Sequence, residues 1–92
     1  MEKTMYALVY TYEGYFNSEP YSLVIAVSND EDKLIKEMKK CVTEDMIEDT
    51  DDEYNEERNF IIQREMDKSV ILNHKYNVDL FIKYEIQIVD VL

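Results

Sequence analysis

Two side chains could in principle form a catalytic nucleophile and its base: Cys41 and His74, the only cysteine and the only histidine. A cysteine nucleophile needs a nearby base or positive charge to hold it as the thiolate. Cys41, however, falls beside the apolar stripe of a predicted helix, which is typical of a buried, inert thiol. His74 lies in a polar stretch, Leu72–Asn77, that predicts an exposed turn. Together they also supply too few ligands for zinc. We therefore expect no catalysis, no metal and no cofactor.

Carboxylates offer a different chemistry, because they are concentrated in one stretch. Residues 44–57 hold nine of the 21 acidic residues and no basic one, and removing them changes the net charge from −11 to −2. Three acids at alternate positions from Asp49 have the spacing of an EF-hand loop, which needs Gly at its sixth position and Glu at its twelfth. Tyr54 and Phe60 occupy those places, so the calcium motif fails.

Two interpretations of residues 44–57 stay open. In the simpler one, a helix end and a loop are kept soluble by their charge. In the other, the carboxylates replace the phosphates of duplex DNA, which carries a charge about every 1.7 Å of helix axis. Apolar residues among the acids would then anchor the segment to the domain or to a partner. The residues predicted to contact that partner are Glu48, Asp49, Asp51, Asp52, Glu53, Tyr54, Glu56 and Glu57.

Composition narrows the class of protein further. The chain has 92 residues, the size of one domain, and 46% of them are hydrophobic. Its negative charge disfavours direct binding of nucleic acid or of anionic membranes and favours basic proteins as partners. A single cysteine suits a reducing compartment. Residues 1–10 lack a signal-peptide pattern, and no apolar run approaches the ~20 residues that span a bilayer. We expect a cytoplasmic protein.

The first third of the chain has the residue pattern of two strands. Met5–Tyr12 and Tyr21–Val27 are rich in β-branched and aromatic residues, and the only Gly and the only Pro lie in the intervening loop, 13–20. Cross-strand aromatic packing is the expected role of the tyrosines on predicted strands, which are Tyr6, Tyr10, Tyr12, Tyr21 and Tyr84.

After Ser28 the spacing of apolar residues changes from the alternation of a strand to the period of a helix. Ser28 followed by Glu31 fits a capping box. An apolar stripe at i, i+4 spacing runs from Leu34 to Met46, with lysines on the opposite side, and predicts an amphipathic helix over about Asp30–Ile47.

The remaining chain predicts more strands. Residues 58–66 fit either a strand or a helix; we favour a strand that pairs with Val70–Leu72 through a turn at 67–68. Leu80–Val89 alternates as a half-buried strand. The prediction for residues 1–92 is therefore a single α+β domain, with four to five mostly antiparallel strands and the helix packed on one face.

In size, acidity, single cysteine, scarcity of glycine and α+β layout, the chain resembles the small inhibitors that bacteriophages make against nucleases, namely anti-CRISPR and DNA-mimicking anti-restriction proteins. The resemblance is one of type, without a shared motif. It implies a non-enzymatic inhibitor that acts in the host cytoplasm and blocks the basic groove of a nucleic-acid-guided or DNA-binding nuclease. The alternative is a small structural or housekeeping module that forms a homodimer through a sheet edge.

Overall fold

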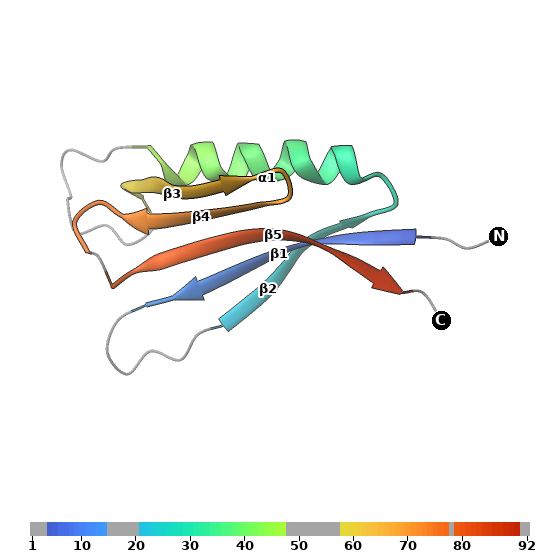
Figure 1. Cartoon of the computed structure of the whole chain (residues 1–92), viewed down its shortest axis with the longest axis horizontal. Coiled ribbons are helices and arrows are strands. Elements are labelled where there is room, and N and C mark those ends of the chain that lie inside the picture. Colours follow the sequence, from blue (N-terminus) through green and yellow to red (C-terminus); the bar gives the residue numbers. More distant parts are fainter. Residues whose placement is uncertain (1–3, 15–20, 48–57, 78, 91–92) are drawn as a thin grey trace.

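One helix packs across one face of an antiparallel sheet of five strands (Figure 1). The computed structural model describes residues 4–14, 21–47, 58–77 and 79–90. The predicted α+β fold and its element order are confirmed within this part of the chain. The elements are β1 (Thr4–Glu13), β2 (Tyr21–Ser28), α1 (Glu31–Asp45), β3 (Phe60–Met66), β4 (Ser69–His74) and β5 (Phe81–Asp90).

The sheet has the strand order β2-β1-β5-β4-β3, with every neighbouring pair antiparallel. The two longest strands, β1 and β5, pair along their whole length, from Thr4 opposite Asp90 to Glu13 opposite Phe81. The first and last strands therefore meet in the middle of the sheet, and the edges are β2 and β3.

The hydrophobic core lies between α1 and the sheet. Leu34, Met38 and Val42, spaced by four residues, are the buried residues of the helix, as its apolar stripe predicts. Met46, the last residue of the predicted stripe, lies after the helix and is exposed. Their side chains share one cluster with those of the strands, and fully burying a side chain of this size contributes about 1.5–3 kcal/mol. The strand members of the cluster are Leu8, Phe60, Val70, Leu72, Ile82, Tyr84 and Ile86, with Leu80 immediately before β5.

The helix begins and ends differently from the prediction. Asp30, not Ser28, is the N-cap, and its carboxylate accepts a hydrogen bond from the backbone N–H of Asp32 at 3.0 Å. Ser28 instead accepts from the N–H of Asp30, so the predicted capping box with Glu31 is wrong. Asp caps a helix as well as Ser does, which explains why the helix could start later. At the other end α1 stops at Asp45, and Met46 is the C-cap.

Residues 60–66 form a strand, as favoured above, and pair back onto β4 through the two residues Asp67 and Lys68. This hairpin turn is fixed at two points. The carbonyl of Lys68 accepts a hydrogen bond from the N–H of Ile86 at 2.9 Å, and its ammonium forms an ion pair with Glu31 at 3.0 Å. The turn therefore connects β5 to the first turn of α1.

His74 is not in an exposed turn, and that prediction is wrong. It is the last residue of β4, only 2% exposed, and pairs with Phe60, whose ring meets the imidazole edge-on with centroids 5.2 Å apart. Nδ1 accepts a hydrogen bond from the N–H of Tyr76 at 3.2 Å. Composition alone suggested a polar turn, whereas pairing across the sheet extends β4 through this residue.

No helix in the described ranges is long and apolar enough to cross a membrane.

Candidate binding groove

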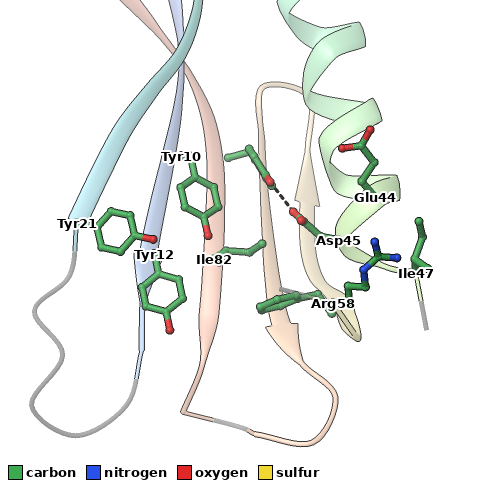
Figure 2. Close-up of a pocket in the computed structure, with 10 residues that line it drawn as sticks. Tyr10, Tyr12, Tyr21, Glu44, Asp45, Ile47, Arg58 and Ile82 are labelled. Carbon is green, nitrogen blue, oxygen red and sulfur yellow. Dashed lines mark hydrogen bonds between the residues drawn. The ribbon is translucent and has the colours of Figure 1, made fainter. Parts of the chain in front are cut away.

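A groove of about 860 Å³ lies between the C-terminal end of α1 and the sheet, where β1 ends and β2 begins (Figure 2). The sheet provides most of its wall through tyrosines. The rest comes from the chain on either side of residues 48–57, which we call the acidic segment. Its lining residues are Tyr10, Tyr12, Tyr21, Glu44, Asp45, Ile47, Arg58, Phe60, Ile82 and Tyr84.

The tyrosines form a continuous aromatic wall because they occupy paired positions on neighbouring strands. Tyr12 pairs with Tyr21 on β2, and Tyr10 pairs with Tyr84 on β5. The rings of Tyr12 and Tyr21 stack with centroids 5.1 Å apart, and those of Tyr10 and Tyr84 are tilted at 5.3 Å. Such pairs add about 0.5–1.5 kcal/mol beyond area burial. The predicted cross-strand packing is confirmed for these four residues.

Asp45 and Tyr84 link the helix to this wall. The Tyr84 hydroxyl donates a hydrogen bond to the carboxylate of Asp45, the last helical residue (Figure 2). Burial raises the pKa of Asp45, although the hydrogen bond from Tyr84 opposes that change and the charge of Glu44 adds to it. The pKa of Tyr84 is also raised, first by burial and then by its hydrogen bond to Asp45. Tyr84 therefore remains a neutral donor at physiological pH.

Asp45 should make the protein less stable as the pH rises. Its pKa is higher in the folded chain than the ordinary 3.8, so folding favours the protonated carboxyl. That contribution is complete below pH 3.8 and is lost as the pH rises through the folded-state value. Asp45→Asn keeps an acceptor for Tyr84 without the charge. We expect its stability relative to wild type to increase between about pH 3 and about pH 7, as measured by urea unfolding.

Glu44→Gln provides the matched control, because Glu44 is the preceding residue and is exposed. It removes the same formal charge from the same end of the helix. A pH dependence that changes equally in both variants would show that net charge, rather than burial of Asp45, sets the trend.

The acidic segment begins and ends at one point of the fold. The N–H of Asn59 donates to the carbonyl of Ile47 at 3.2 Å, and the carbonyl of Asn59 accepts from the N–H of Lys75 at 2.8 Å. Asn59 has a φ of 67°, in the left-handed region that Asn tolerates better than most residues. It is fully buried. We call this arrangement of Ile47, Asn59 and Lys75 the neck.

The residues predicted to contact a partner lie outside the described part of the chain. These are Glu48, Asp49, Asp51, Asp52, Glu53, Tyr54, Glu56 and Glu57. The structure instead places the residues on either side of them, Ile47 and Arg58, in the wall of the groove.

Cys41 is half-buried and packs against the core. Burial raises its thiol pKa, and the charges of Glu37, Asp45 and Glu44 raise it further. A raised pKa keeps the thiol protonated at neutral pH, which is the opposite of what a nucleophile needs. The described residues also contain no group of three or more His, Cys, Asp or Glu side chains that could hold a metal.

The groove itself was not predicted from the sequence. Alternation placed Tyr10 and Tyr12 on one face of a strand and Tyr84 on one face of another, but it did not show that these two strands are neighbours. Pairing of the first strand with the last is the missing information. No family model, no curated protein and no solved structure matches this chain.

Proposed function

We propose that this chain is a non-enzymatic inhibitor that presents an acidic surface to the basic, nucleic-acid-binding groove of a nuclease effector, in the manner of anti-CRISPR and anti-restriction proteins. The supporting observation is the neck, where the hydrogen bond from Asn59 to Ile47 holds both ends of the acidic segment together beside the tyrosine-lined groove. The proposed place of action is the cytoplasm.

The excess negative charge of the chain is concentrated in residues 44–57, which include the segment that the neck closes. Residues 48–57 carry seven carboxylates, and Glu44 and Asp45 precede them at the end of α1. The rest of the chain is close to neutral, at −2. A local concentration of negative charge steers a basic surface toward it and speeds association.

The groove adds a site for the side chains of such a basic surface. Arginine and lysine bind over aromatic rings, with a contribution of about 0.5–2 kcal/mol that increases as water is excluded. Tyr10, Tyr12 and Tyr21 provide aromatic rings, and Glu44 provides an exposed carboxylate in the same groove. We propose that an arginine or lysine of the partner enters here while the acidic segment covers the basic residues around it.

The test is capture of partners from a bacterial lysate by the immobilised chain, with washes of increasing salt. We compare wild type with a variant that carries Asp51→Asn, Asp52→Asn, Glu53→Gln and Glu56→Gln. Exposed ion pairs contribute about 0.2–1 kcal/mol each, so four neutralised acids should weaken binding by about fourfold to several hundredfold. Salt should release the partner from wild type, and DNA should compete with the chain for it.

A second variant serves as the control for net charge. Glu13→Gln, Glu37→Gln, Glu65→Gln and Asp67→Asn together remove four carboxylates that lie outside residues 44–57. This variant should bind as wild type does. Equal loss of affinity in both variants, or a captured partner that still binds DNA in the complex, would contradict the proposed function.

A further inference from the structure

The only glycine of the chain, Gly14, comes directly after β1 and two residues after Tyr12, which lines the groove. Glycine serves where the backbone needs a positive φ or where another group approaches it closely. Gly14 does not have a positive φ. The reason for glycine at this position is therefore a close neighbour rather than an unusual backbone conformation.

That neighbour is the ring of Tyr12. A Cβ atom added to Gly14 would lie 2.7 Å from the Oη atom of Tyr12, 2.8 Å from its Cε1 and 2.9 Å from its Cζ. Non-bonded carbon atoms pack at about 3.5–4.0 Å, so a side chain at position 14 would overlap the ring. The contact arises because residues i and i+2 of an extended chain lie on one face and side chains lean along the strand. The ring of Tyr12 extends toward the end of β1 (Figure 2).

Neighbouring strands hold the ring of Tyr12 in this place. It stacks on the ring of Tyr21 in β2, with centroids 5.1 Å apart and an angle of 24° between the planes. On its other side Tyr12 pairs with Ile82 of β5, and it packs against the core. The ring of Tyr21 in turn lies 6.3 Å from that of Tyr10. Displacing the Tyr12 ring therefore breaks its stack with Tyr21 and changes the shape of the aromatic wall.

We infer that Gly14 is a positioning residue of the groove: the space left by its missing side chain holds the ring of Tyr12 and fixes the end of the aromatic wall. The contact exists in the free chain and needs no partner. Its consequence for binding rests on the proposed function, in which the groove receives an arginine or lysine of the partner. With the Tyr12 ring displaced, that cation loses one of the aromatic rings over which it binds.

Nuclear magnetic resonance of the free chain tests the contact directly. In wild type, an α-proton of Gly14 should show a nuclear Overhauser effect to the ring protons of Tyr12, because the two groups touch. In Gly14→Ala, the Overhauser effects between the rings of Tyr12 and Tyr21 should be lost, because the new methyl group displaces the first ring. Absence of the first signal from wild type, or unchanged signals between the two rings in the variant, would overturn the inference.

A double-mutant cycle in urea separates the contact with Tyr12 from the general effect of alanine at this position. Alanine in place of glycine restricts the unfolded chain, which by itself raises stability. Gly14→Ala should nevertheless lower the urea midpoint when Tyr12 is present, and should not lower it in a Tyr12→Leu background. Leucine is the matched background, since it keeps an apolar side chain without the ring atoms that a Cβ would meet. An equal change of the midpoint in both backgrounds would overturn the inference.

Capture of the partner extends the test to the groove. Gly14→Ala should weaken retention of the partner by about twofold or more, through the loss of one contact between a cation and a ring. It should cause no further loss in the Tyr12→Leu background, and an equal loss there would contradict a role through Tyr12. A wild-type chain that captures no partner would contradict the proposed function alone, because the resonance and urea experiments decide the role of Gly14 without one.

Discussion

Replacing Ile82 with alanine should lower the free energy of unfolding by about 2–5 kcal/mol. Ile82 is 1% exposed and lies on the central strand β5, opposite Tyr12 on one side and Leu72 on the other. Its removal leaves a cavity in the core that the regular sheet cannot close easily, so the loss of transfer free energy and the cost of the cavity add. The whole free energy of unfolding of a small domain is only about 5–15 kcal/mol. The variant should therefore unfold at a much lower urea concentration.

Ile61→Ala is the comparison, because it removes the same atoms from a half-exposed position on an edge strand. We expect a change within about 1 kcal/mol, since little apolar area is returned to water. Unfolding curves of both variants at one protein concentration measure the difference. Similar losses of stability would show that the core is not centred on β5.

Replacing Asn59 with alanine should have the second largest effect, about 2–4 kcal/mol. Alanine in the left-handed region costs about 1–2 kcal/mol, and the buried polar contacts of the asparagine side chain are lost as well. Asn59→Gly loses the same side chain without the backbone penalty, because glycine adopts positive φ freely. The glycine variant should therefore be the more stable of the two by about 1–2 kcal/mol.

Equal stability of the alanine and glycine variants would contradict a left-handed backbone at Asn59. The pair also tests the neck as a functional element. If the neck positions the acidic segment, partner affinity in the capture experiment should fall more for alanine than for glycine, in the same order as stability.

Most of the fold could be predicted from local patterns. The i, i+4 stripe of α1 and the alternation of β1, β2 and β5 are signals within one element. Each of these elements formed within two residues of its predicted bounds, although α1 has a different N-cap from the predicted one. Residues 58–66 were ambiguous between helix and strand, because a short apolar run has no clear period. Pairing with β4 decides the outcome. The prediction that His74 is exposed was wrong for a related reason, since its burial depends on Phe60, fourteen residues earlier in the chain.

Less of the candidate site could be predicted. The concentration of charge in residues 44–57 is visible in the sequence, but the neck depends on one residue with positive φ, Asn59, next to the unremarkable Arg58. The groove depends on contact between β1 and β5, which are separated by most of the chain. Composition reveals which side chains are available, whereas register and strand order decide which of them meet.

The neck also bears on how this protein could change through evolution or design. The hydrogen bond between Ile47 and Asn59 holds the two ends of the intervening segment at fixed points of the domain. Lengthening a loop between fixed ends costs little, about 0.6 kcal/mol for each doubling of its length. Insertions between Ile47 and Asn59 should therefore be tolerated better than insertions within the strands or the helix. The fold is a frame on which recognition of one partner could be replaced by recognition of another.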